Sequence, residues 1–167
     1  MRILGIDPGL STTGYGVIEI TAKGVVCLTY GGIKTSAAAF AEKLNVIHKK
    51  MHRIITEYQP DFCAVEEVFY HQNKKTAIIM GHARAVAILA AAQNDIQISE
   101  YSPREVKMSI AGSGAASKEQ IQAMVKNILR LPEIPHPNDA ADALAVALCH
   151  HHRLKFQQIT RQATAGE

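Results

Sequence analysis

Short runs of apolar and β-branched residues, separated by turn signals, open the chain. Residues 2–7, 12–20 and 25–34 are rich in Ile, Val, Tyr and Thr, and Pro8-Gly9 and Lys23-Gly24 divide them. Glycine and proline pairs of this kind mark tight connections between strands. We therefore expect three successive strands that form an antiparallel meander.

The pattern changes from strand-like runs to helical spacing after this meander. Apolar side chains recur every three or four residues from Ala39 to Tyr58, which indicates one face of an amphipathic helix, and Pro60 ends it. The remaining pattern predicts a strand at 61–68, a helix at 73–93, a strand at 96–101 and helices around a glycine-rich break at Gly112 and Gly114. The order β-β-β-α-β-α-β-α-α predicts an α/β fold: a mixed sheet, first antiparallel and then parallel, flanked by helices.

Length and composition indicate one globular domain. The chain has 167 residues and 47% apolar content, which fits a single core over residues 1–153. Residues 154–167 carry little apolar surface, so we expect a disordered tail. Asp7 interrupts the first apolar run too early for a signal peptide, and Cys27, Cys63 and Cys149 are scattered singly. We expect a cytoplasmic protein with reduced cysteines.

Two strand ends carry carboxylates. Asp7 ends the first strand, at the sheet edge where open α/β sheets place their ligands, although Asp-Pro-Gly is also an ordinary turn sequence. Glu66 and Glu67 follow the buried run 62–65, where a carboxylate is costly unless it is paired or binds a metal. Because side chains alternate along a strand, only one of the two glutamates can join Asp7, and the alternation does not say which.

A second pair of carboxylates opens the last helix. Asp139 and Asp142 lie three residues apart in an alanine-rich segment, so both project from one helix face. Helix capping is the alternative explanation, since acids are favoured in a first helical turn. Together with Asp7 and a glutamate, however, they place four negative charges in one cleft. Such a cluster suits two Mg²⁺ ions, or Mn²⁺, in phosphodiester hydrolysis.

Three motifs resemble, in order, those of RuvC-type Holliday junction resolvases. They are Gly5-Ile6-Asp7-Pro8-Gly9, Ala64-Val65-Glu66-Glu67-Val68-Phe69 and Asp139-Ala140-Ala141-Asp142-Ala143-Leu144-Ala145. The resemblance covers roughly residues 1–150. It implies a ribonuclease H-like fold, a metal-dependent endonuclease that acts in DNA recombination and repair, and Asp7, Glu66, Asp139 and Asp142 as its catalytic and metal-binding acids. It also implies a homodimer that nicks two strands of like polarity, with RuvA and RuvB as partners.

The same resemblance implies DNA contacts. Lys107 and Lys118 match lysines that hold phosphates, and Phe69 matches a residue that stacks on a base near the crossover, although an isolated Phe is more often part of the core. The loop with Gly112 and Gly114 leads into Ser117, and Gln120 three residues on predicts a capping box whose helix end favours a phosphate. A flexible surface linker is the alternative for this loop.

Two further segments bear on assembly and metal binding. The helix at 75–93 is apolar nearly all round, more than one sheet face can cover, so we expect its excess in a twofold dimer interface. His150, His151 and His152 are consecutive and point in different directions on a helix, so we expect a solvated helix end instead of a metal site.

Three other functions remain open from the motifs. The segment from Gly5 to Thr12 also resembles the phosphate loop of actin-like ATPases and sugar kinases, but those proteins need a second lobe. A RuvC-like nuclease acting on structured RNA shares the acidic motifs, although the Glu66–Phe69 segment and Lys107 favour the resolvase. A module that binds junctions without cutting them would not need all four acids.

Overall fold

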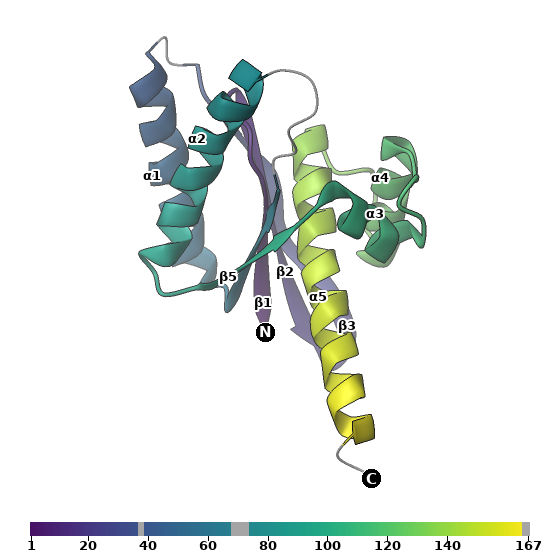
Figure 1. The fold of residues 1–167 in the computed structure, drawn as a ribbon. Helices are drawn as coiled ribbons and strands as arrows, with labels where there is room; N and C mark the ends of the chain where they lie inside the picture. The colour runs from purple at the N-terminus through teal and green to yellow at the C-terminus, as the bar shows by residue number, and fades with distance from the viewer. Residues whose placement is uncertain (37–38, 68–73, 165–167) are drawn as a thin grey trace.

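The computed structural model describes residues 1–36, 39–67 and 74–164 (Figure 1). Its strands are β1 (Arg2–Asp7), β2 (Thr12–Thr21), β3 (Gly24–Lys34), β4 (Phe62–Glu66) and β5 (Gln97–Tyr101). Its helices are α1 (Phe40–Tyr58), α2 (Lys74–Ala92), α3 (Pro103–Ala111), α4 (Lys118–Ile128) and α5 (Asn138–Thr164).

The five strands form one mixed sheet in the order β3-β2-β1-β4-β5. β1, β2 and β3 pair antiparallel, as a meander does, while β4 pairs parallel to β1 and β5 parallel to β4. The predicted sheet is therefore confirmed. The carboxyl ends of β1, β4 and β5 meet at one edge, because parallel strands joined through helices all run the same way.

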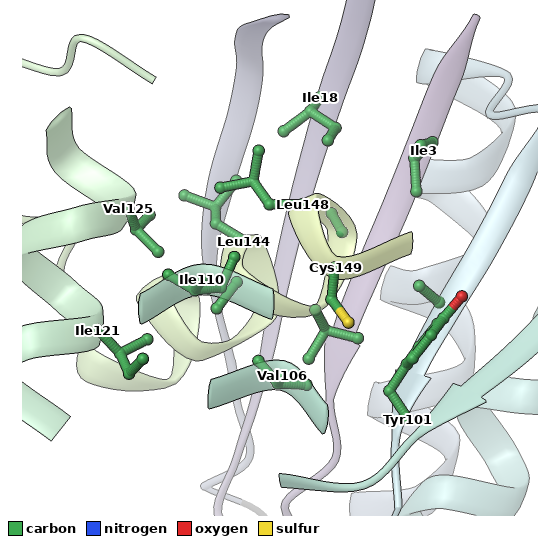
Figure 2. Close-up of a cluster of buried hydrophobic side chains, with 14 of the residues drawn as sticks. Ile3, Ile18, Tyr101, Val106, Ile110, Ile121, Val125, Leu144, Leu148 and Cys149 are labelled. Carbon is green, nitrogen blue, oxygen red and sulfur yellow. The ribbon is translucent and has the colours of Figure 1, made fainter. Parts of the chain in front are cut away.

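Helices cover the sheet on both sides (Figure 1). α1 and α2 lie against one face, over a core that includes Leu4, Ile6 and Val65. α5 lies across the other face, with α3 and α4 packed outside it. Figure 2 shows the core on this second side, where Leu144 and Leu148 of α5 lie between the sheet and the outer helices. The central strands β1 and β4 thus bury both of their faces, as their continuous apolar runs require.

The C-terminal part of the chain differs from the expected pair of helices, because it forms three. Gly112, with φ at 70°, ends α3, and Ser117 begins α4 with the predicted capping box to Gln120. The second break, between α4 and α5, contains Pro132, Pro135 and Pro137. Proline removes a backbone donor and clashes with the preceding turn, so these residues separate α4 from α5.

The expected disordered tail and the expected solvated histidines both differ from the structure. α5 continues as helix through Thr164, because Lys, Gln, Arg and Ala propagate a helix that packing has already nucleated. Residues 155–163 are nevertheless exposed and lie beyond the core. His150 is only 3% exposed, since it lies on the side of α5 that faces the sheet.

The surface of α2 is unusually apolar. The helix buries its small residues Ala83, Ala87 and Ala90 against the body of the protein, while Ile78 and Leu89 are 61% and 50% exposed. By length and composition its residues 75–92 could also span a bilayer, with 22% of that stretch buried. Because its alanine face packs on α1, α2 is an element of this fold with one large apolar side left uncovered.

Candidate active site

Strand register brings the first two carboxylates together. Ile6 pairs with Val65 in the parallel β1–β4 ladder, so Asp7 and Glu66 end neighbouring strands at the same level. Asp7 shares its strand face with Ile3 and Gly5, which lie under α5. Glu66 shares its face with Phe62 and Ala64, which also lie under α5. Glu67 is the next residue along the chain and therefore does not share this face. Glu66 is the glutamate that neighbours Asp7.

Two glycines let α5 approach the sheet closely enough to add its own acids. Gly14 is the register partner of Asp7, and a β-carbon on Gly14 would lie 1.9 Å from the carbonyl oxygen of Asp139. A β-carbon on Gly5 would lie 2.0 Å from the carbonyl oxygen of Ala143. The helix backbone therefore rests directly on the strand backbone. This contact fixes the first turn of α5, with Asp139 and Asp142, beside Asp7.

The clustered carboxylates perturb one another. Burial raises the pKa of Asp7 well above its usual range, and the charges of Glu66, Asp142 and Asp139 raise it further. Burial likewise raises the pKa of Glu66, although a hydrogen bond with Asp7 and the charges of Lys118 and Lys107 oppose the rise. Uncompensated negative charge in a buried cleft is unfavourable, so this group of acids needs cations.

A lysine supplies one of those cations in the structure. Lys118 Nζ lies 2.6 Å from Asp142 Oδ2. Burial lowers the pKa of Lys118, but the hydrogen bond and charge of Asp142 outweigh it and raise that pKa. Beside this ion pair is a cavity of about 230 Å³, whose lining includes Glu66, Lys107, Lys118 and Asp142. The cavity therefore joins two acids of the cluster to the two lysines predicted to hold DNA phosphates.

The donor set fits a hard divalent cation in its chemistry. All four groups are carboxylates, and burial first, then neighbouring carboxylate charge, raises the pKa of Asp7 and of Glu66, so a bound cation would stabilise their ionised forms. Within residues 1–36, 39–67 and 74–164, no three acidic, His or Cys side chains stand close enough to hold an ion as they are arranged. Asp142 is instead turned to Lys118 through its Oδ2 atom.

The other predicted DNA contacts are distributed differently. Gly112 and Gly114 lie in the loop between α3 and α4, outside the residues that line the acidic cavity. Phe69 lies outside the described residues. Sequence reasoning missed the packing roles of Gly5 and Gly14. The sequence pattern that could have indicated the close approach of a helix is Gly5, which lies two residues before Asp7 and therefore on the same face of the strand.

The sheet order, the helix across one face and the acids at the carboxyl ends of β1 and β4 define a nuclease of the ribonuclease H-like class. A family model described as "Crossover junction endodeoxyribonuclease RuvC" matches residues 3–150. The chain belongs to this RuvC family. Its enzyme class is accordingly crossover junction endodeoxyribonuclease, the class that cuts DNA at Holliday junctions, and the family depends on a metal.

Individual relatives agree with this assignment over nearly the whole chain. The RuvC of Alkaliphilus oremlandii is 50% identical over 160 residues, covering 95% of this chain and 98% of that protein. The RuvC of Dehalococcoides mccartyi strain 195 is 50% identical over 163 residues, covering 97% and 99%. The nuclease acting on structured RNA finds no support among these relatives.

Solved structures show the same fold. The structure of Thermus thermophilus RuvC matches with a TM-score of 0.87 and 34% identity, covering 94% of this chain and 97% of that one. The same protein in complex with a Holliday junction substrate matches with a TM-score of 0.88 and 34% identity, covering 94% and 96%. The yeast mitochondrial Holliday junction resolvase Ydc2, 12% identical with a TM-score of 0.58, shares the fold. The predicted ribonuclease H-like class is confirmed.

Proposed function

We propose that this chain resolves Holliday junctions by metal-assisted hydrolysis, with Asp7, Glu66, Asp139 and Asp142 as its catalytic and metal-binding residues. The observation that carries the proposal is the convergence of these acids from β1, β4 and α5. Burial and then the charge of Glu66 raise the pKa of Asp7, and burial and the charge of Asp142 raise the pKa of Glu66. Such perturbed carboxylates in a cleft are typical of catalytic sites.

The four acids would hold two Mg²⁺ ions, and Mn²⁺ can take their place. Ions held there would activate a water molecule and neutralise the leaving 3′ oxygen. The chain's own residues set the geometry: Asp7 and Glu66 fix one side of the site from the sheet, and Asp139 and Asp142 fix the other from α5. Products with 5′-phosphate and 3′-hydroxyl ends, which a ligase can seal, follow from this chemistry.

Lys107 and Lys118 are proposed to bind the DNA phosphate next to the cut. Both line the cavity that contains Glu66 and Asp142, so a phosphate bound there is adjacent to the acids. Lys118 pairs with Asp142 in the free protein and would pair with the phosphate when DNA is bound. Its charge would thus have a partner in both states. Gly112, Gly114 and Phe69 complete the proposed DNA contacts.

We further propose a homodimer built on the uncovered apolar side of α2. A twofold protein matches a twofold junction and would nick two strands of like polarity symmetrically. Exposure of Ile78 and Leu89 on one helix supports this surface as the interface. The proposal includes RuvA and RuvB as the complex that delivers the junction, and the cytoplasm as the place of action.

The decisive experiment is incubation of the protein with a synthetic mobile Holliday junction and Mg²⁺. Paired nicks on strands of like polarity are expected from the wild type. Asp7→Asn should bind the junction and fail to cut it, because it keeps the lysines and loses one carboxylate ligand. An intact protein that leaves the junction uncut while cleaving structured RNA would refute the proposal.

A further inference from the structure

The edge of the sheet that carries Glu66 has little direct contact with α5. α5 packs mainly on β1 and β2, through the close approaches at Gly5 and Gly14, and much less on β4 and β5. Those approaches fix Asp139 and Asp142 relative to Asp7. Glu66 ends β4, which is hydrogen-bonded to β1, so the β1–β4 ladder holds Glu66 beside Asp7. The separation between this edge of the sheet and α5 depends in addition on the side chains that bridge the two.

Tyr101 makes such a bridge from a position beside Glu66. It is the last residue of β5 and the register partner of Glu66, and its carbonyl oxygen accepts a hydrogen bond of 2.9 Å from the backbone N–H of Glu67. Its side chain is 2% exposed and reaches into the core between the sheet and α5 (Figure 2). Movement of Tyr101 would thus move the end of β4.

Two residues of α5 hold the Tyr101 side chain. The hydroxyl lies 2.7 Å from Nδ1 of His150, in a buried hydrogen bond. The guanidinium of Arg153, one turn further along the helix, lies over the ring at 5.6 Å from its centroid. The His150 ring also contacts Phe62, at the start of β4, with centroids 5.2 Å apart. His150 therefore contacts both strands of this edge.

Burying the imidazole of His150 in the core costs free energy of folding. His150 is 3% exposed and its Nε2 has no hydrogen-bond partner in the described residues, so Tyr101 is its one recorded polar partner. A phenylalanine would fill similar space without an unpaired polar atom. A polar group kept in a core at such a cost commonly specifies one arrangement of the elements it joins.

We infer that the Tyr101–His150 hydrogen bond is a positioning contact for the active site, which sets the distance between Glu66 on β4 and the acids of α5. Tyr101 and His150 act through Glu66 and touch neither substrate nor metal. The inference rests on the proposed role of the four acids. Because metal sites tolerate little displacement of their ligands, loosening this contact weakens metal binding before it affects DNA binding.

The test compares Tyr101→Phe and His150→Phe with the wild type and with Tyr58→Phe, a control at the end of α1. Mn²⁺ affinity is measured without DNA by electron paramagnetic resonance, and the Mg²⁺ dependence of junction cleavage is measured alongside. Both core variants should bind Mn²⁺ roughly tenfold more weakly, the lower end of what orienting groups around a metal contribute. Saturating Mg²⁺ should restore cleavage, and junction affinity in EDTA should match the wild type.

The double variant should bind Mn²⁺ no more weakly than either single one, since both remove the same contact. If Tyr101→Phe lowers the melting temperature and leaves Mn²⁺ affinity unchanged, the contact is structural only and the inference is wrong. Failure of the underlying proposal looks different: Asp7→Asn would then bind Mn²⁺ as tightly as the wild type. That result would overturn both.

Discussion

At the scale of single residues, the site opposes the stability of the protein that carries it. Asp7 and Glu66 lie half-buried side by side with raised pKa values, and Lys118 forms its ion pair with Asp142. A core that served stability alone would contain none of these charges. The residues are therefore best understood as a site prepared for cations and paid for by the surrounding fold.

Replacing Asp7 should stabilise the metal-free protein. Asp7→Asn keeps the shape of the side chain and removes a charge whose raised pKa shows that ionisation is disfavoured there. We expect the free energy of unfolding in EDTA at neutral pH to rise by about 0.5–2 kcal/mol, as at other strained functional sites. Denaturant titration measures it, with Glu67→Gln as control. A less stable Asp7→Asn would contradict the interpretation.

Buried His150 should make the protein sensitive to acid. Burial, followed by the charges of Arg153 and His151, lowers its pKa from 6.5 to about 4. The unfolded chain therefore takes up a proton at a pH where the folded protein does not, and stability falls as pH drops from 6.5 towards 4. The expected loss is about 1–3 kcal/mol. His150→Phe should flatten that part of the stability profile, and an unchanged slope would assign the loss to other groups.

At the scale of elements, the contact between α5 and the sheet determines where the proposed catalytic acids lie. α5 rests on β1 and β2 backbone to backbone, which only glycine at positions 5 and 14 permits. The alanines of α5, among them Ala140 and Ala143, are fully buried on the same side. Small residues on both partners thus bring Asp139 close to Asp7, so the proposed active site depends on this packing.

Adding a methyl group at this contact should separate the acids. In Gly14→Ala the new carbon would meet the carbonyl of Asp139, and the helix must shift or the strand must bend. We expect a loss of about 1–3 kcal/mol in the free energy of unfolding, as for other overpacked cores, and a fall in cleavage at saturating junction. Gly81→Ala is the control, because its position in α2 has open space. Normal cleavage by Gly14→Ala would show that the close approach is dispensable.

At the scale of the whole molecule, the proposed dimer gives the exposed apolar side of α2 a partner. Ile78 is 61% exposed on this helix, and Phe156 is 70% exposed at the far end of α5. Ile78→Glu should convert the dimer to a monomer in analytical ultracentrifugation, because it places a charge in the proposed interface. Phe156→Glu should leave the dimer intact. If the two variants sediment alike, the interface lies elsewhere.

Much of this fold is determined locally and could be predicted from the sequence. The meander, the parallel strands and the amphipathic α1 follow from the spacing of apolar residues and from turn residues such as Pro8-Gly9, which act over a few positions. The capping box at Ser117 is equally local. Asp139 likewise predicts where the last helix begins, although the predicted element order has two helices after β5 where three form.

The sequence by itself also determined which residues could form the site: strand-end acids at Asp7 and Glu66 or Glu67, and a helix-start pair at Asp139 and Asp142. Only the tertiary structure decided that Glu66 shares a sheet face with Asp7, because that depends on which face α5 covers. It also decided that Lys118 pairs with Asp142 and that His150 is buried against Tyr101. Each of these contacts joins residues far apart in the chain, and local patterns carry no information about such distances.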